Sequence, residues 1–327
     1  MKLLDQYGRK ITYLRISVTD RCNLRCIYCM PEKAIVFKER KDILTYDEII
    51  RIVNLSVEIG INKIKITGGE PLVRKDIIFL IDRLTKIKGI EDISLTTNGI
   101  LLDENVAKLK ESGLRRLNIS LDTLKEERFR FITKLGELQK VLKGIVKAKK
   151  LGMNPVKINT VVIKGINDDE IFDFVRFGLE NSCIVRFIEY MPTNNSFGWS
   201  LSKFVSIDEI KGKCSELGEL YPDVLVKGGG PAEYFKIKVG NKEGIIGFIN
   251  PVSHHFCSNC NRLRLTADGK LRSCLFAIDG INLKTILRNG ASDEEIKEAI
   301  INAIRLKPKE HLFDIVSDGS IMYQVGG

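Results

Sequence analysis

Six of the eight cysteines fall into two groups of three, at C-x3-C-x2-C and C-x2-C-x13-C spacing: Cys22, Cys26, Cys29, and Cys257, Cys260, Cys274. Thiolates select soft metals, chiefly zinc and the iron of iron–sulfur clusters. The N-terminal "MKLLDQYGRK" carries charge too early for a signal peptide, so we expect a cytoplasmic chain with reduced thiols. The cysteines therefore favour metal or redox chemistry over a disulfide framework.

The first group, in "RCNLRCIYCM", leaves one ligand position open. A structural zinc site needs four protein ligands, and no histidine or fourth cysteine lies nearby in the sequence. A four-iron cluster can instead take three thiolates and keep its fourth iron for a small molecule. We expect such a cluster here.

The second group, in "CSNCNRLRLTADGKLRSC", also has three thiols, and a zinc site completed by His254 or His255 stays a competing interpretation. The intervening "ADG" predicts a hairpin turn. Arg262 and Arg264 are two apart on the predicted strand, hence on one face. Each guanidinium group can donate two parallel hydrogen bonds to phosphate oxygens, which predicts a phosphorylated substrate. The alternative is an exposed basic strand.

The elements that must position these residues alternate between short β-rich runs and helical segments. The expected strands are 12–18, 63–67, 92–96, 115–120, 156–162 and 183–188. Helices with apolar residues at helical spacing lie between them, for example 45–59 and 137–151. Repeated strand–helix units imply parallel strands, so we predict an α/β fold, an incomplete (β/α)6 TIM-like barrel. An open doubly wound sheet is the alternative.

The strand–helix rhythm stops near residue 193. We therefore divide the chain into a partial barrel, 1–193, and a C-terminal α+β region, 194–327, with a hairpin within 227–250 and a helix over 292–305. In a parallel barrel the loops after the strands surround one mouth. The first cysteine group, "TGGEP", "TTNG", "SLD" and "EYMP" all follow predicted strands, so we expect the chemistry at that rim.

The charge balance also bears on the partner. Lys and Arg number 52 against 42 Asp and Glu, a net charge of +10, which favours an anionic partner. The basic residues are dispersed, so a small anion is preferred to nucleic acid. The sequence contains no run of about eighteen uncharged apolar residues, so we expect no membrane span.

The first cysteine group resembles the radical S-adenosylmethionine (SAM) superfamily. The resemblance lies in the C-x3-C-x2-C spacing after a first strand, the aromatic Tyr28 before the last cysteine, and "GGEP" at 68–71. It implies a [4Fe–4S] cluster whose open iron chelates SAM, and reductive cleavage of SAM to a 5′-deoxyadenosyl radical. Its glycines would let the backbone approach SAM closely.

The whole chain from about residue 11 is similar to the GTP 3′,8-cyclase family of molybdenum-cofactor biosynthesis. Segments in matching order are "LRISVTDRCNLRCIYCMP", "KITGGEPLVRKD", "LTTNG", "NISLDT", "CSNCNRLRLTADGKLRSCL" and the final Gly326-Gly327. The resemblance implies that Cys22, Cys26 and Cys29 hold the SAM cluster, and that Cys257, Cys260 and Cys274 hold a second [4Fe–4S] cluster facing the substrate.

The same resemblance implies the ligand contacts. SAM would meet Tyr28, Gly69, Ser120 and Met191. GTP would meet Arg15, Lys65, Thr96, Lys157, Arg262, Leu263 and Arg264. Catalysis would depend on Arg262, Arg264, Gly326 and Gly327. Lys65 departs from the arginine common in the family; the charge is kept, but lysine lacks the bidentate fork.

The implied reaction begins when the deoxyadenosyl radical removes the 3′ hydrogen of the GTP ribose. The carbon radical then adds to guanine C8, and one electron and one proton complete 3′,8-cyclo-7,8-dihydro-GTP. The implied partners are GTP, a low-potential electron donor and a downstream cyclic pyranopterin monophosphate synthase; a homodimer stays open, and neither nucleic acid nor a membrane is expected. The rivals are a radical SAM enzyme acting on a peptide and a zinc-stabilised nucleic-acid-binding protein.

Overall fold

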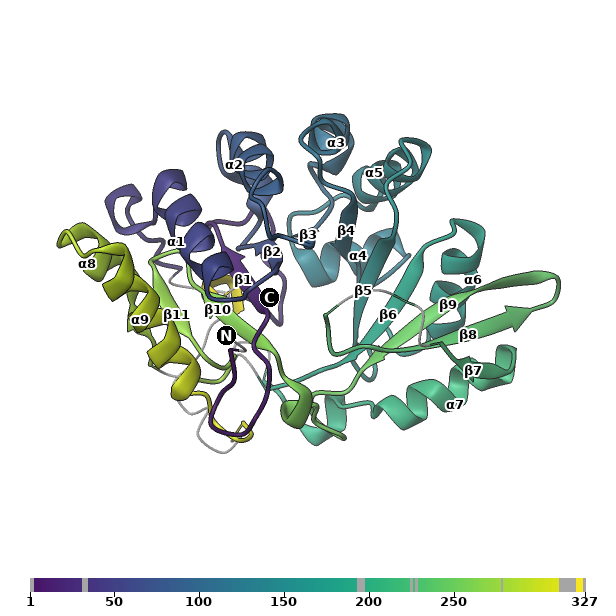
Figure 1. Cartoon of the computed structure of the whole chain (residues 1–327). Coiled ribbons are helices and arrows are strands. Elements are labelled where there is room, and N and C mark those ends of the chain that lie inside the picture. The colour runs from purple at the N-terminus through teal and green to yellow at the C-terminus, as the bar shows by residue number, and fades with distance from the viewer. Residues whose placement is uncertain are drawn as a thin grey trace.

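A computed structural model describes residues 3–30, 35–192, 198–223, 226, 229–277, 279–311 and 322–325 (Figure 1). Within these residues the strands form one twelve-stranded sheet. Its order is β12-β11-β10-β1-β2-β3-β4-β5-β6-β9-β8-β7.

Six parallel neighbours form the middle of the sheet, as the sequence predicts. They are β1 (Tyr13–Ser17), β2 (Lys63–Thr67), β3 (Asp92–Thr97), β4 (Arg116–Ser120), β5 (Val156–Val162) and β6 (Ile184–Glu189). Each lies within two residues of its predicted bounds. The sheet does not close on itself, so the predicted incomplete barrel is confirmed.

Helices cover the outer side of this row of strands (Figure 1). They are α1 (Tyr46–Glu58), α2 (Ile77–Thr85), α3 (Leu102–Glu111), α4 (Glu126–Thr133), α5 (Leu138–Lys150) and α6 (Ile171–Glu180). Thr45 begins α1 with a capping box, in which its hydroxyl accepts from the Glu48 amide and the Glu48 carboxylate accepts from the Thr45 amide. The apolar faces of these helices bury the strand side chains, which explains the near-continuous apolar runs in the strands.

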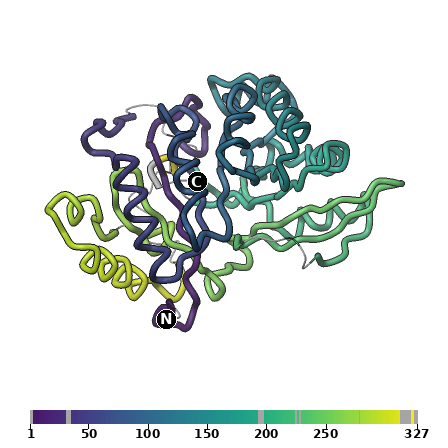
Figure 2. Tube along the Cα trace, turned by 45° about the horizontal axis from the view of Figure 1, so that its top comes forward, coloured from purple at the N-terminus to yellow at the C-terminus, as the bar shows by residue number. Residues whose placement is uncertain are grey.

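The C-terminal strands extend the same sheet at both ends. β7 (Leu220–Pro222), β8 (Glu233–Val239) and β9 (Lys242–Ile249) lie beyond β6; β10 (Arg262–Leu265), β11 (Lys270–Arg272) and β12 (Ile281–Asn282) lie beyond β1. The hairpins β8–β9 and β10–β11 were predicted, but their attachment to opposite ends was not. Figure 2 shows the β8–β9 hairpin projecting from the molecule, away from α9.

This topology determines the path of residues 250–261. β9 is parallel to β6 and β10 is parallel to β1, so the connection between them runs from one end of the parallel row to the other. Cys257 and Cys260 lie on this connection. Cys257 and Cys260 of the second group therefore lie at the open side of the incomplete barrel.

The remaining helices are α7 (Ile207–Leu217), α8 (Leu283–Arg288), α9 (Asp293–Arg305) and α10 (Met322–Val325), with short 3-10 turns at Arg40–Asp42, Pro71–Val73, Leu201–Lys203 and Cys257–Asn259. α9 begins with a second capping box, Ser292 and Glu295, at the predicted position. It packs beside α1, where Arg51 binds Asp293 at 2.7 Å. Because α1 belongs to the barrel, this contact ties the C-terminal region to it; the division at residue 193 itself stays a prediction.

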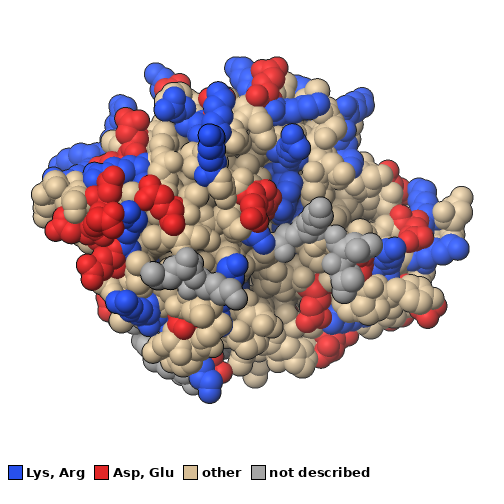
Figure 3. Space-filling view, viewed as in Figure 1, with Lys and Arg blue, Asp and Glu red and all other residues tan. Residues whose placement is uncertain are grey.

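Charge is mixed on the visible surface. Figure 3 shows blue and red side chains interspersed over the helices, with acidic groups most frequent on the side of α8 and α9. This agrees with the dispersed basic residues of the sequence. No helix in the described part of the chain has the length and apolar character that crossing a membrane requires.

Candidate active site

One cavity at the C-terminal ends of the parallel strands brings most of the predicted site residues together. From the predicted set it is lined by Arg15, Cys22, Cys26, Tyr28, Cys29, Lys65, Gly69, Thr96, Ser120, Met191, Cys257, Cys260, Arg262, Arg264 and Cys274. Both cysteine groups therefore face the same space; the rim argument predicts this position for the first group only. His311 and Met322, from the C-terminal part of the chain, also line it.

The first cysteine group lies in a turn directly after β1. The Cys29 amide donates to the Cys26 carbonyl at 2.9 Å, and the Leu24 amide donates to the Cys22 sulfur at 3.4 Å. Burial raises the pKa of Cys22 to about 11 and that of Cys29 to about 12. Thiols that resist ionisation when metal-free are stabilised as thiolates once a cation binds, so the donor set fits an iron–sulfur cluster.

Asp122, at the start of the loop after β4, holds this turn. Its carboxylate accepts a 2.5 Å hydrogen bond from the Tyr28 hydroxyl and a 2.8 Å bond from the Val161 amide. Burial raises the pKa of Asp122 to about 6, while both hydrogen bonds oppose the rise. The sequence analysis noted "SLD" as a rim loop but gave Asp122 no role; its place directly after a predicted strand was the available signal.

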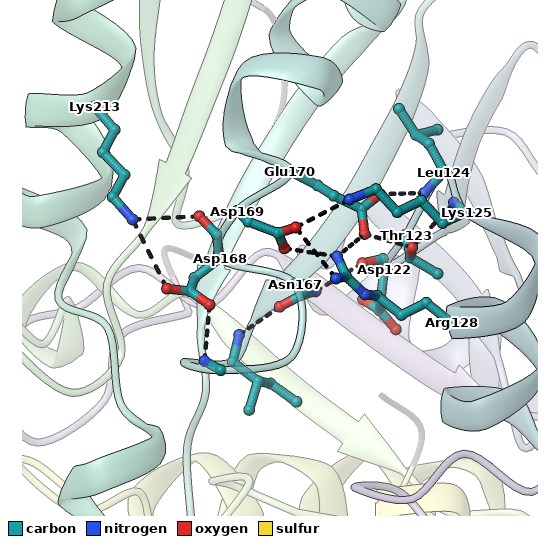
Figure 4. A network of polar contacts seen from close by, with 12 residues as sticks. Asp122, Thr123, Leu124, Lys125, Arg128, Asn167, Asp168, Asp169, Glu170 and Lys213 are labelled. Carbon is teal, nitrogen blue, oxygen red and sulfur yellow. Dashed lines mark hydrogen bonds and ion pairs between the residues drawn. The ribbon is translucent and has the colours of Figure 1, made fainter.

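The loop that carries Asp122 is itself hydrogen-bonded to the β5–α6 loop (Figure 4). The Glu170 carboxylate accepts from the Thr123 hydroxyl at 2.6 Å and the Leu124 amide at 2.7 Å. The Asn167 side-chain amide donates to the Asp122 carbonyl at 2.7 Å. Tyr28 is thus connected through Asp122 to two further loops of the rim.

The "GGEP" loop holds the cysteine turn from the other side. The Gly69 amide donates to the Thr19 carbonyl at 2.7 Å, and a side-chain carbon at Gly69 would stand 2.3 Å from the Arg21 carbonyl oxygen. The glycine is therefore required by the segment that leads into Cys22, a reason that the sequence analysis did not give. Glu70 accepts from Leu72, Thr97 and Asn98, and burial raises its pKa to about 7 despite these bonds.

The second cysteine group is assembled from distant segments. Cys257 and Cys260 lie on the 250–261 connection, and Cys274 follows β11. His311 Nδ1 lies 3.0 Å from the Cys257 sulfur. Two other histidines were named for a zinc site. His254 binds Asp208 at 3.0 Å, and the His255 ring packs edge-to-face against His311.

Cations surround this second group. Burial alone would raise the pKa of Cys260, but the charges of Arg262 and Lys307 outweigh this effect and lower the pKa to about 6. Lys307 is only 2% exposed, and its ammonium donates to the carbonyls of Arg262 and Ser273. Sequence reasoning missed Lys307 and His311, since neither lies within a motif or follows a strand.

The spacing of the thiols bears on the type of metal. In the described residues no three His, Cys, Asp or Glu side chains are grouped closely enough to hold one metal ion. A zinc ion needs all its ligands around one point, whereas a four-iron cluster takes each thiolate at a different iron. Both groups therefore fit a cluster better than a single zinc ion.

A row of basic side chains lines the same cavity as the two cysteine groups. Arg264 of β10, Arg15 of β1 and Lys65 of β2 are direct partners across the sheet, so their side chains share a face. Burial lowers the pKa of Arg15 to about 10 and that of Lys65 well below its usual value, and the neighbouring cations add to both effects. Buried cations that repel one another are stabilised by an anion, which fits a phosphate group.

Polar atoms in the same cavity also indicate a ligand. Thr96 Oγ1 and Asn159 Oδ1 are buried and have no hydrogen-bond partner among the described residues. Unsatisfied buried polar atoms are costly unless a ligand or water completes them. Thr96 was predicted as a substrate contact; Asn159, on β5, was not.

The other predicted residues lie differently. Lys157 is buried and donates to the Tyr234 hydroxyl at 2.7 Å, and burial followed by the Arg186 charge lowers its pKa to about 7. The Leu263 side chain belongs to the hydrophobic core. Gly326 and Gly327 lie outside the described residues.

Comparison with known proteins agrees with this geometry. Residues 16–178 match the model of the Radical SAM superfamily, and residues 183–313 match that of Molybdenum Cofactor Synthesis C. The chain is 52% identical to the GTP 3′,8-cyclase of Thermodesulfovibrio yellowstonii over 93% of this chain and 94% of that protein. It is 48% identical to the GTP 3′,8-cyclase of Syntrophomonas wolfei over 99% of this chain and 100% of the other. The chain belongs to the GTP 3′,8-cyclase family.

Solved structures support the fold of the family. The chain is similar to SuiB of Streptococcus suis bound to the precursor peptide SuiA, with a TM-score of 0.64, 15% identity, and coverage of 98% of this chain and 77% of SuiB. At this identity the likeness concerns the fold alone. Radical SAM membership implies a [4Fe–4S] cluster and SAM, and a second cluster is consistent with the family.

Proposed function

We propose that this chain catalyses the conversion of GTP to 3′,8-cyclo-7,8-dihydro-GTP in molybdenum-cofactor biosynthesis. The observation that carries the proposal is the row Arg264–Arg15–Lys65, which lines the same cavity as the two cysteine groups. A peptide substrate would not require buried cations in register, whereas a triphosphate would. Family membership at about half identity over nearly the whole chain supports the same reaction.

Each cysteine group would hold one cluster. Cys22, Cys26 and Cys29 would hold the cluster that binds SAM, and Cys257, Cys260 and Cys274 the cluster that faces GTP. When bound, the first cluster supplies the electron for reductive cleavage of SAM, which yields the radical that starts the reaction. We assign SAM contacts to Tyr28, Gly69, Ser120 and Met191, each of which lines the cavity.

The chain's own residues would orient the substrate. Arg15, Lys65 and Arg264 would neutralise the triphosphate, and Thr96 would donate its hydroxyl to the nucleotide. Arg262 lies over the Phe256 ring at 4.7 Å, which fixes its guanidinium at the cavity wall. Holding GTP in this cavity would orient its ribose for the reaction and exclude water from the reacting atoms.

Some assignments carry over from the family with less support. Leu263 would contact GTP only through its backbone, because its side chain is in the core. Lys157 would reach GTP only by leaving Tyr234. We keep Gly326 and Gly327 as catalytic residues on the family resemblance alone. A low-potential donor, a downstream synthase and a cytoplasmic location complete the proposal.

The test is an anaerobic assay of the iron–sulfide-reconstituted protein with SAM, dithionite and GTP. We expect 5′-deoxyadenosine and a product isomeric with GTP, because the 3′ hydrogen that GTP loses is balanced by one electron and one proton. The product is identified after dephosphorylation by chromatography with mass spectrometry. Deuterium at the GTP 3′ position should appear in 5′-deoxyadenosine. If deoxyadenosine forms without deuterium and without a GTP product, the substrate assignment is wrong, and a peptide screen follows.

A further inference from the structure

The second cysteine group has a buried lysine beside it that the proposed function does not use. Lys307 follows α9, is 2% exposed, and donates to the Arg262 carbonyl at 2.9 Å and the Ser273 carbonyl at 2.5 Å. Arg262 is two residues after Cys260, and Ser273 immediately precedes Cys274. One ammonium therefore joins the two backbone segments that present two of the three thiols.

The backbone on both sides of Lys307 is held in place. Its amide donates to the Ile304 carbonyl at the end of α9, and its carbonyl accepts from the Gln6 side chain at 3.2 Å. Arg9 donates to the carbonyls of Pro308 at 2.6 Å and Lys309 at 2.9 Å. The backbone of Lys307 is thus held by residues that do not line the cavity.

Arg9 extends the same arrangement to the third thiol. It is 8% exposed, binds Asp5 at 2.5 Å, and donates to the Cys257 carbonyl at 2.8 Å. The segment 307–309 and the N-terminal segment 5–9 are therefore both hydrogen-bonded to the backbone of the second group. A lysine fixed in this way is costly to bury unless negative charge lies close to it.

The negative charge available is that of the thiolates. The charges of Cys260 and Cys274 raise the pKa of Lys307, although burial lowers it more strongly. A thiolate-bound cluster gains one negative charge when it is reduced, so a fixed cation nearby stabilises the reduced form. Hydrogen bonding and charge around the sulfurs are among the main determinants of cluster potential.

We propose that Lys307 is a positioning residue of the second cysteine group, which holds the Cys260 and Cys274 segments together and raises the reduction potential of the cluster bound there. This inference rests on the proposed function only in assigning a cluster to that group. It does not require GTP or turnover.

The test compares Lys307→Gln, Lys307→Met and the control Lys309→Gln in the reconstituted full chain. Gln keeps a donor and loses the charge; Met loses both; Lys309 is exposed and contributes only its carbonyl to Arg9. The readouts are iron per chain and the midpoint potential of each cluster, from electron paramagnetic resonance during a redox titration without GTP. The first cluster serves as an internal reference.

We expect both Lys307 variants to shift the second cluster to lower potential by at least a tenfold change in the reduction equilibrium, which is 59 mV for one electron. The first cluster and Lys309→Gln should match the unmodified protein. Selective loss of the second cluster, with the first retained, would also support the assignment. Unchanged potentials at full iron content would overturn it, and so would loss of both clusters with general unfolding. Failure of the GTP assay alone would leave these readouts intact, so the two proposals are tested separately.

Discussion

The two cysteine groups supply the same ligands in different electrostatic surroundings, and the difference is largest at Cys260. Burial raises the pKa of Cys22, Cys26 and Cys29 most strongly; Glu70 adds to the rise at Cys22, and neighbouring thiols followed by Asp122 add to it at Cys26 and Cys29. In the second group burial also raises the pKa of Cys257, but at Cys260 burial is outweighed by Arg262 and Lys307, which lower its pKa to about 6.

The two groups meet different requirements of the proposed chemistry: electron donation to SAM and binding of an anionic nucleotide. Carboxylates beside the first group disfavour further negative charge, which lowers the reduction potential and suits an electron donor to SAM. Cations beside the second group favour negative charge, which suits the binding of an anionic nucleotide. Each experiment below changes one side of this contrast and uses the other side as its control.

The largest effect is expected when either group is removed. Replacing Cys22, Cys26 and Cys29 by Ala should remove about four irons per chain and abolish both SAM cleavage and product formation, because the site of electron transfer to SAM is lost. Replacing Cys257, Cys260 and Cys274 should also remove about four irons and abolish the GTP product, yet leave 5′-deoxyadenosine formation detectable. Iron analysis and chromatography of both products check these outcomes. SAM cleavage that survives the first replacement would refute the assignment of the groups.

A contrast of reactivity follows in the metal-free protein. With a pKa of about 6, Cys260 is mostly thiolate at pH 7, whereas Cys22, with a pKa of about 11, is ionised to only about one part in ten thousand. The lower nucleophilicity of the more acidic thiol offsets roughly two powers of ten of this difference. We expect iodoacetamide to modify Cys260 about a hundredfold faster.

Peptide mapping at several pH values measures this contrast. The Cys260 rate should fall as the pH drops below about 6, because the thiolate is then protonated, while the Cys22 rate should keep rising above pH 7. Cys214, a buried residue of α7 with a pKa raised by burial to about 12, is an internal control that should stay unmodified. Equal rates at Cys22 and Cys260 would contradict the contrast.

The first group could be predicted almost completely from the sequence because it is local. Its thiols lie within one turn, directly after a strand whose bounds follow from a short apolar run. The loops that contact it also follow predicted strands, so the barrel rule brought them to the same rim. The hydrogen bond from Tyr28 to Asp122 and the close approach of Gly69 to the Arg21 carbonyl needed the structure.

The second group could not be predicted beyond its cysteines, because its surroundings depend on sheet order. Whether β10 adds beside β1 or elsewhere is not encoded in the local pattern, yet this position aligns Arg264 with Arg15. Lys307 and Arg9 are more than two hundred residues apart in the chain and meet only once α9 is docked on α1. Their sequence neighbours are ordinary charged segments.

The basic row provides a test of intermediate size. Lys65→Met removes one buried cation beside Arg15. A charge-assisted hydrogen bond contributes about 2 kcal/mol, which corresponds to roughly a 30-fold weaker affinity for GTP. Equilibrium binding to the reconstituted protein, with guanosine as a comparison ligand lacking phosphates, checks it. Lys242→Met, at the far end of the β8–β9 hairpin, is the matched control. An equal loss of guanosine and GTP binding would show that Lys65 does not act through phosphate.

The smallest expected effect, and the one that tests the comparison most directly, comes from Asp122→Asn. The amide keeps the shape of the side chain but removes the charge that accepts from Tyr28 and Val161. Groups that orient metal-binding loops typically contribute 10- to 100-fold, so we expect SAM affinity to fall about tenfold, with the second group unaffected. Asp169→Asn, in the exposed part of the same network in Figure 4, is the control. Because a carboxylate is lost, the potential of the first cluster should rise, opposite in sign to the shift expected at the second cluster from Lys307→Gln. If both substitutions move their clusters in the same direction, the opposed surroundings do not set the two potentials.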